Sequence, residues 1–296
     1  MFSFSITDDV THWETPDGAI RVHYSLEGPN QTNLFDSNDD GLPDFVEQVA
    51  QIAQESLSLF SELNLLSPID ESVFNLSDNG GSDALDFYLI DFGGNADGHF
   101  GVDACDEQNR CTGHMVIEND FSGYSYSDYL EGLTTVVPHE IFHLVQAAYT
   151  RSLPIWISEG TAVWAQRRYD LDSRDFRRFA STYLAETSRP LNKPPSGPVQ
   201  AFAYGTCIWW EFLTLRHGVD LIEELLSAWQ PLEGDAEMVS AMVAVLEARG
   251  DSMASMWTDF ASYNLSTGAR SGILESYPDA PLLSGISIIE QAETIE

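Results

Sequence analysis

The fold is decided by the stretch Val136-Val137-Pro138-His139-Glu140-Ile141-Phe142-His143-Leu144-Val145-Gln146. On a helix, residues four apart lie on the same face, so His139 and His143 can offer two imidazole nitrogens to one ion. Glu140 lies roughly 100° further round the helix, where its carboxylate can reach water at that ion. Zinc accepts neutral imidazole readily, and a catalytic zinc site keeps one position open for water. The stretch therefore predicts the centre of a zinc site.

A third ligand is needed, because two histidines alone do not make a protein zinc site. Glu159 stands near the start of the next helical pattern, in the stretch Trp156-Ile157-Ser158-Glu159-Gly160-Thr161-Ala162. If that helix returns antiparallel to the first, Glu159 can direct its carboxylate back to the histidine pair, and Gly160 permits a close helix approach. The alternative is a solvated glutamate at a helix N-terminus, where the helix dipole favours a negative charge. The upstream motif favours ligation.

Together these stretches resemble the gluzincin group of zinc metallopeptidases, in which two histidines and one glutamate bind the metal. The chain is also similar to a set of secreted bacterial metallopeptidases that carry an Asp-rich segment early and a Trp-x-x-Glu-Gly-Thr-Ala segment after the active-site helix. Residues 36–44 and 156–162 match these segments, and residues 260–268 resemble a third feature of that set. Two departures are the short spacing to Glu159 and Val163, which stands where some gluzincins place an aspartate that orients a ligand.

The resemblance implies a zincin-like α+β fold with a cleft between two lobes. Residues 1–152 would form a mixed-sheet lobe with a calcium loop and the active-site helix, and residues 153–296 a helical lobe that carries Glu159. It implies that the strand over 112–117 lies at the sheet edge and pairs with an extended substrate. It also implies an oxyanion donor from the helical lobe. Tyr204 is the candidate, with a packed cap residue as the alternative, and His217 is a weaker one.

The stretch Asp36-Ser37-Asn38-Asp39-Asp40-Gly41-Leu42-Pro43-Asp44-Phe45-Val46-Glu47 fits the spacing of a calcium loop. Calcium binds six to eight oxygens, and glycine at the sixth position permits the sharp turn. The alternative is an Asp-rich turn that caps the following helix. A structural calcium site is favoured, with these ligands: Asp36, Asn38, Asp40, the backbone carbonyl of Leu42, Asp44 and Glu47. A second group matches no firm template, and a solvated loop is favoured for it: Asp91, Asn95, Asp97, Asp103 and Asp106.

Hydrophobic periodicity predicts the remaining elements. Strands are expected over 17–27, 85–90 and 112–117, a long helix over 43–63, and loops over 66–84 and 91–112. The active-site helix is expected to begin near Thr134 or Thr135, which puts Pro138 in its first turn. Further helices are expected over 161–169, 173–187, 203–216, 219–229, 235–249 and 252–264. The proline-rich loop over 188–198 is expected to line or cross the cleft.

The composition excludes some partners and suggests a compartment. The formal net charge of −34, with 13 Lys and Arg together, disfavours nucleic acid and anionic membranes as partners. The chain has no run approaching the ~18 apolar residues that span a bilayer. Its first residues lack the features expected of a signal peptide, so either the protein is not exported or its signal has been removed, and the resemblance favours a secreted protein whose signal has been removed. Cys105 and Cys111 are close enough to form a disulfide, which is compatible with export, and Cys207 is expected to be a buried thiol.

The sequence thus predicts a zinc metallopeptidase that acts on a peptide or protein substrate. His139, His143 and Glu159 would bind zinc, Glu140 would act as the general base, and Tyr204 would stabilise the oxyanion. Two alternatives stay open. One is an exopeptidase of the same chemistry. The other is a calcium-stabilised extracellular binding or adhesion module with a vestigial zinc site.

Overall fold

The computed structural model describes residues 3–74, 76, 79–194 and 201–286. The described residues form a five-stranded mixed sheet in the order β1-β2-β3-β5-β4. Its strands are β1 (Val10–Glu14), β2 (Ile20–Ser25), β3 (Leu85–Ile90), β4 (Gly98–Cys105) and β5 (Cys111–Glu118). The β2, β3 and β5 strands run parallel, and the outer strands β1 and β4 run antiparallel to their neighbours.

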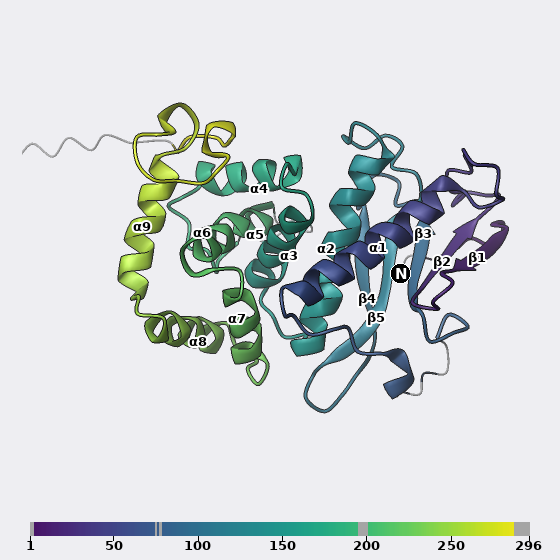
Figure 1. The fold of residues 1–296 in the computed structure, drawn as a ribbon, viewed down its shortest axis with the longest axis horizontal. Helices are drawn as coiled ribbons and strands as arrows, with labels where there is room; N and C mark the ends of the chain where they lie inside the picture. The colour runs from purple at the N-terminus through teal and green to yellow at the C-terminus, as the bar shows by residue number, and fades with distance from the viewer. Residues whose placement is uncertain (1–2, 75, 77–78, 195–200, 287–296) are drawn as a thin grey trace, which may run out of the picture.

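One face of the sheet is covered by two helices, α1 (Asp44–Glu62) and α2 (Tyr129–Tyr149), which cross it in Figure 1. Because side chains alternate along a strand, Val22, Phe87 and Met115 point to this face, and all three are fully buried. The helices contribute Val49 and Ile141 to the same core. This packing fixes α2, which carries the histidine motif, against the central strands.

The α2 helix begins earlier than the sequence indicated. Its N-cap is Asp128, whose side chain accepts a hydrogen bond from the Glu131 backbone, while Glu131 accepts one from the Ser127 backbone. The expected start near Thr134 or Thr135 is therefore wrong. Pro138 lies inside the helix rather than in its first turn. The histidine pair consequently lies well within a long buried helix instead of at its beginning.

The segment over 91–112, expected to be a solvated loop, contains β4, which pairs antiparallel with β5. The β5 strand therefore lies inside the sheet, and the expectation that residues 112–117 form its edge is wrong. The edge strand is β4, with sequence Gly-His-Phe-Gly-Val-Asp-Ala-Cys. An exposed edge strand needs little apolar surface, so this segment lacked the alternation that reveals a half-buried strand. The β1 strand was missed for the same reason.

The rest of the chain is helical and lies at the left of Figure 1. The expected helical patterns are confirmed to within a few residues, with two exceptions: α3 begins at Ile155 rather than 161, and the single helix expected over 203–216 is divided into α5 and α6. These helices are α3 (Ile155–Tyr169), α4 (Arg174–Ala185), α5 (Ala201–Gly205), α6 (Cys207–His217), α7 (Leu221–Trp229), α8 (Asp235–Ala248) and α9 (Met253–Leu265). Short 3-10 turns lie at Glu71–Phe74, Gly268–Arg270 and Ala280–Leu282. The hydrophobic core continues from the sheet into the helices, and the architecture is α+β.

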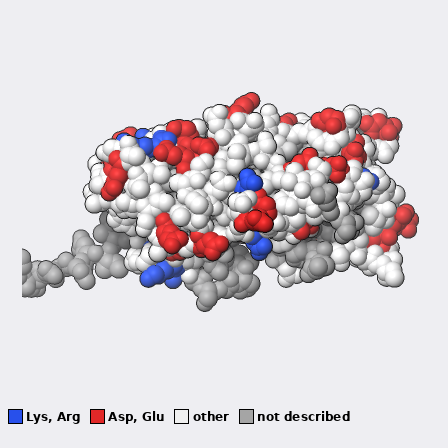
Figure 2. All heavy atoms as spheres, turned by 90° about the horizontal axis from the view of Figure 1, so that it is seen from below, with Lys and Arg blue, Asp and Glu red and all other residues white. Residues whose placement is uncertain are grey.

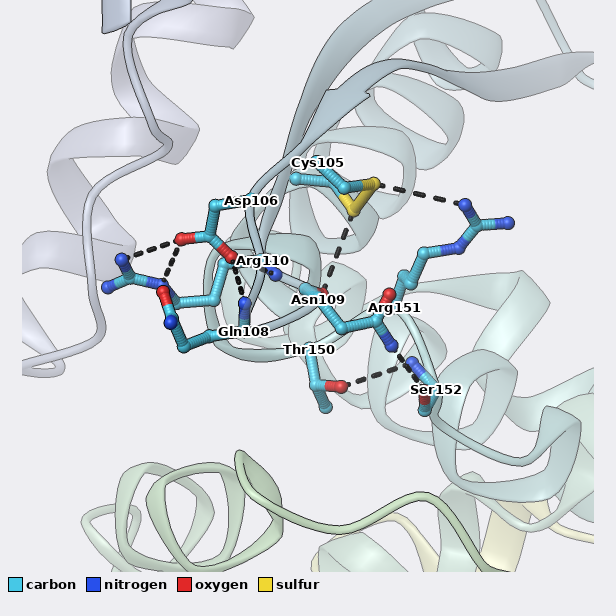
Figure 3. Close-up of a disulfide and its surroundings, with 9 residues drawn as sticks. Cys105, Asp106, Gln108, Asn109, Arg110, Thr150, Arg151 and Ser152 are labelled. Atoms are coloured by element: carbon cyan, nitrogen blue, oxygen red, sulfur yellow. Dashed lines mark hydrogen bonds and ion pairs between the residues drawn. A yellow bond between two sulfur atoms is a disulfide. The ribbon is translucent and has the colours of Figure 1, made fainter. Parts of the chain in front are cut away.

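The β4–β5 hairpin is closed by the disulfide between Cys105 and Cys111, whose Cα atoms are 4.0 Å apart (Figure 3). The predicted bridge is therefore present, and Cys207 is a buried free cysteine as expected. The carbonyl of Asn109 in the hairpin turn accepts a hydrogen bond from the Arg151 backbone. The Asn109 side chain donates to the Ser152 hydroxyl. These contacts tie the hairpin to the connection between α2 and α3.

The surface in Figure 2 carries many scattered Asp and Glu side chains and few Lys and Arg, as the composition requires. Within the described ranges, no helix has both the length and the apolar character to cross a bilayer.

Candidate metal centre

His139, His143 and Glu159 meet at one point between α2 and α3. The His139 Nε2 atom lies 3.3 Å from Glu159 Oε2, His143 Nε2 lies 3.4 Å from the same oxygen, and the two Nε2 atoms are 3.2 Å apart. In the part of the chain that the structure describes, this is the one group of His, Cys, Asp or Glu residues whose three ligand atoms lie within 4.8 Å of one another. The three residues predicted as ligands are thus brought together in an arrangement that can hold a metal ion.

The close packing of α3 positions Glu159. Gly160 lies against α6, since a Cβ atom built there would be 2.1 Å from Thr206 Oγ1 and 2.6 Å from Trp210 Nε1. Thr206 in turn donates a hydrogen bond to the Trp156 carbonyl at the start of α3. A side chain at position 160 would therefore push α3 away from α6. The Glu159 side chain is only 17% exposed, which rules out a solvated surface glutamate.

The two glutamates of the site have pKa values shifted in opposite directions. Burial alone would raise the pKa of Glu159, but the positive charge of His143 and hydrogen bonds from both imidazoles lower it well below its usual range. Burial raises the pKa of Glu140 to about 6, and the nearby histidines only partly oppose this. Burial would lower the pKa of His143, yet the charge of Glu159 raises it to about 9. Without a metal ion, a proton on His143 balances the negative charge of Glu159. A bound cation would displace that proton.

Gln146 orients His143. Its Oε1 atom lies 2.9 Å from His143 Nδ1, while its Nε2 atom donates to the Ser158 carbonyl and to Thr161 Oγ1, each at 2.8 Å. An acceptor at Nδ1 keeps the proton on that nitrogen and leaves Nε2 to face the cluster. Val163 is fully buried in the core and takes no part in the site. The role of Gln146 was not predicted from the sequence, although Gln146 follows His143 by three residues and therefore lies on the same face of the helix.

Glu140 and the edge strand lie in direct contact. A Cβ atom at Gly98 would be 2.7 Å from Glu140 Oε1 and 2.4 Å from Val136 Cγ1, so only glycine fits at this position of β4. A cavity of about 280 Å³ is lined by β4 residues Gly98, His99 and Phe100 together with the candidate metal ligands His139, His143 and Glu159. A second cavity, of about 480 Å³, continues past Glu140 toward α4. The edge of the sheet thus borders the site.

Tyr204, on α5, borders both cavities. Its ring stacks on that of His139 at 5.7 Å between centroids, next to Glu159 in the smaller cavity. Burial, then the negative charges of Glu159 and Glu140, raises its pKa well above the usual value. His217 lies elsewhere, with Nε2 3.4 Å from Asp251 and against Met256. Of the two residues considered as oxyanion donors, only Tyr204 lies beside the candidate metal ligands.

The predicted calcium loop folds into a tight turn ahead of α1. Gly41 has φ of +92°, and Asp36 and Asp40 accept hydrogen bonds from the backbones of Gly41 and Leu42. Burial, followed by the charges of Asp40, Asp44 and Asp36, raises the pKa of Glu47. The buried Asp36 Oδ1 has no hydrogen-bond partner among the described residues. These features suit a cation, although the acidic ligand atoms do not converge within 4.8 Å.

The second Asp-rich group is not assembled into a site. Asp97 accepts a hydrogen bond from Tyr126 at 2.6 Å, and Asp106 pairs with Arg110 at 2.7 Å. Asp103 lies 2.9 Å from His114 on the β4–β5 hairpin. Each of these three carboxylates is therefore engaged separately and none joins a shared ion site, but the favoured solvated loop is wrong for Asp103, which lies in β4.

The proline-rich loop borders a different cavity. Residues 188–192 line a space of about 500 Å³ next to Trp156 and Trp209, not the cavities at the metal-binding cluster. Residues 195–200 lie outside the described part of the chain. For the residues that the structure describes, the expectation that this loop lines the cleft is therefore wrong.

No family model and no curated protein matches this chain.

Proposed function

We propose that the protein is a zinc-dependent metallopeptidase with a zincin-like fold. One observation carries the proposal: the ligand atoms of His139, His143 and Glu159 lie within 4.8 Å of one another, beside the buried carboxylate of Glu140. A binding site for a structural ion has no need of this second carboxylate. Its presence beside the cluster favours catalysis over simple metal storage.

The donor set fits zinc. Two imidazole nitrogens and one carboxylate oxygen are the ligands of a known class of catalytic zinc site, in which the fourth position stays open. Gln146 supplies the acceptor that such a histidine ligand needs at its other nitrogen. A bound zinc ion would supply Lewis-acid polarisation of a carbonyl group and would acidify water.

Glu140 is the proposed general base. A base works best when its pKa is near the operating pH, and burial raises that of Glu140 to about 6. Its carboxylate can take a proton from the attacking water and pass it to the leaving amine. Tyr204 is the proposed oxyanion donor, because its raised pKa keeps the hydroxyl protonated and able to donate.

A peptide or protein is the proposed substrate. The β4 strand presents a sheet edge beside the cluster, and an extended peptide can add to such an edge through main-chain hydrogen bonds. This kind of binding gives affinity without side-chain specificity. The cavities on either side of Glu140 provide room for flanking side chains.

Calcium in the loop 36–47 and secretion belong to the same proposal. A cation there would neutralise the repulsion between carboxylates that, together with the larger effect of burial, raises the pKa of Glu47, and it would brace the start of α1. The disulfide and the acidic surface are compatible with an extracellular protein.

The test is Glu140→Gln, with zinc content and cleavage of a peptide library measured on the same preparations. We expect stoichiometric zinc in both proteins, with cleavage reduced by about 10²- to 10⁴-fold in the variant, the usual contribution of a general base. The matched control is Glu62→Gln, the same change at an exposed position at the end of α1, which should leave cleavage unaltered. Cleavage by Glu140→Gln at the parent rate would refute the mechanism.

The same assay separates the alternatives. Zinc bound stoichiometrically without cleavage of any peptide would favour a binding or adhesion module with a vestigial site. Cleavage restricted to peptides with a free amino terminus would indicate an exopeptidase of the same chemistry.

A further inference from the structure

The face of the sheet opposite α1 and α2 carries a cavity of about 420 Å³. Strand alternation puts Asp86 and Tyr88 of β3 and His114 of β5 on this face, since Phe87 and Met115 point into the core. The cavity has an apolar side and an acidic side. Its apolar walls are Phe4, Tyr88, Ile90 and Val116, and its polar walls include Glu71, Asp86, Asp103 and His114.

Glu71 is the unusual member of this set. It lies in the 3-10 turn ahead of β3, is only 5% exposed, and its Oε2 atom has no hydrogen-bond partner among the described residues. Burial, then the charges of Asp86 and Asp103, raises its pKa to about 7. Buried carboxylates are normally paired or hydrogen-bonded, because removing a charge from water is unfavourable. Glu71 therefore has unused capacity to accept hydrogen bonds beside the cavity.

The other charged groups on this face are already engaged. Asp86 lies 2.8 Å from His23 Nε2, and both oxygens of Asp103 lie 2.9 Å from His114 Nδ1. The guanidinium of Arg21, on the same face of β2, pairs with Glu14 at 3.3 Å. Above about pH 7, where Glu71 is ionised, the three carboxylates of the cavity thus exceed the positive charge that two histidines can supply. The imbalance favours a cationic ligand.

The geometry of the cavity does not suit a metal ion. Within the described ranges, the residues around this cavity do not bring three ligand atoms within 4.8 Å of one another, as the zinc-type cluster does. A compact ion would leave the apolar walls unused. A charged head with an aliphatic stem matches both sides of the cavity, and a guanidinium or ammonium group offers several donors to a carboxylate.

We propose that this cavity binds an alkylguanidinium or alkylammonium group, the chemistry of an arginine or lysine side chain, with its head at Glu71 and its stem along Tyr88, Ile90 and Val116. The site lies across the sheet from the metal-binding cluster. It does not depend on the peptidase proposal.

The test is calorimetric titration of N-butylguanidinium into the full chain saturated with calcium, which keeps the loop 36–47 from contributing. N-butylurea, the neutral analogue of nearly the same shape, is the ligand control. We expect butylguanidinium to bind and butylurea not to bind. Equal heats from both ligands, or no binding of butylguanidinium, would overturn the proposal without needing any variant.

Glu71→Gln removes the charge and keeps the shape, and we expect it to weaken butylguanidinium binding about tenfold or more, the usual effect of losing a charged hydrogen-bond partner. Glu62→Gln is the matched control and should bind as the parent does. Unchanged affinity in a folded Glu71→Gln protein would contradict the assignment of the head group to Glu71. Displacement of butylguanidinium by further calcium would mean that the cavity is a metal site.

A blocked tripeptide, acetyl-Gly-Arg-Gly-amide, distinguishes the source of the ligand. Tighter binding of the tripeptide than of butylguanidinium would support the side chain of a peptide as the natural occupant. Binding of butylguanidinium alone would support a free small amine or guanidine. Both results support a site for a guanidinium or ammonium group, and they differ only in the molecule that carries this group.

Discussion

Replacing Gln146 by leucine should weaken zinc binding without touching a proposed ligand. Gln146 accepts from His143 Nδ1 at 2.9 Å and donates to the Ser158 carbonyl and Thr161 at 2.8 Å. Leucine has a similar volume but no polar atoms. The imidazole of His143 would lose the acceptor that fixes its tautomer, and the Ser158 carbonyl would lose a donor. Both losses fall on groups that hold the cluster in place.

The magnitude follows from the role of such partners. Removing the group that orients a metal-bound histidine typically lowers metal affinity by about 10- to 100-fold, which equals about 1.4 to 2.8 kcal/mol. Loss of the Gln146 amide would also lower folding stability by about 1 kcal/mol, the net contribution of one hydrogen bond, because the Ser158 carbonyl loses one donor and keeps that of Thr161 Oγ1 at 3.4 Å. The first effect appears in metal titrations and the second in unfolding of the metal-free protein. They can therefore be separated.

The assay is competition for zinc against a chromophoric chelator, at constant pH, with the folded state checked by circular dichroism. Gln146→Glu is the matched variant, since a carboxylate keeps the acceptor at His143 Nδ1 while losing the amide donors. We expect zinc affinity to fall in Gln146→Leu and to be retained in Gln146→Glu. Affinity within about twofold of the parent in Gln146→Leu would refute the orienting role, given the range expected for such groups.

Three further predictions concern parts of the chain outside the cluster. Calcium at about 100 times its dissociation constant should stabilise the parent by about 2.7 kcal/mol and raise its melting temperature. Asp40→Ala should lose most of this response. Equal shifts of the melting temperature in both proteins would argue against a calcium loop. Replacing Cys105 and Cys111 by serine together should lower the free energy of unfolding by about 2 kcal/mol in urea titrations, the loss expected for so short a loop, and an unchanged midpoint would contradict it. Because the pKa of Glu71 is raised from 4.5 to about 7 in the folded protein, the folded state binds its proton more tightly, and stability should fall as pH rises through this window. The free energy of unfolding of Glu71→Gln should therefore exceed that of the parent by about 1–3 kcal/mol at pH 8 but by little at pH 4. A difference that does not change with pH would refute the raised pKa of Glu71.

Local spacing was enough to predict the centre of the site. His139 and His143 meet because a helix places residues four apart on one face, which needs no knowledge of the rest of the fold. Glu159 required one more step, the antiparallel return of the next helix, and Gly160 was the signal for close approach. The C-terminal helices were also predictable, because their apolar residues repeat at helical spacing over many turns.

The edge of the sheet and the start of α2 were not predictable in this way. The position of β4 depends on its pairing with β5, a non-local contact, and its Gly-rich sequence carries little apolar alternation. The start of α2 at Asp128 depends on one capping aspartate in a run of Ser, Tyr and Asp residues, where several positions could serve as caps. The cavity at Glu71 could not be predicted from the sequence, because its walls come from six separate segments of the chain.

The contrast between Glu140 and Glu159 supports the division of roles between them. Both are glutamates near the same two histidines, so proximity to positive charge does not distinguish them. Glu159 is hydrogen-bonded to both imidazoles, and its pKa falls, which keeps it anionic and suited to hold a cation. Glu140 lies against Gly98 on the far side of the cluster, and burial raises its pKa to about 6, which suits it to carry a proton. When a fold separates the pKa values of two neighbouring carboxyl groups in this way, it assigns them different chemistry. Exchanging the two environments, not the two residues, would be needed to exchange their roles.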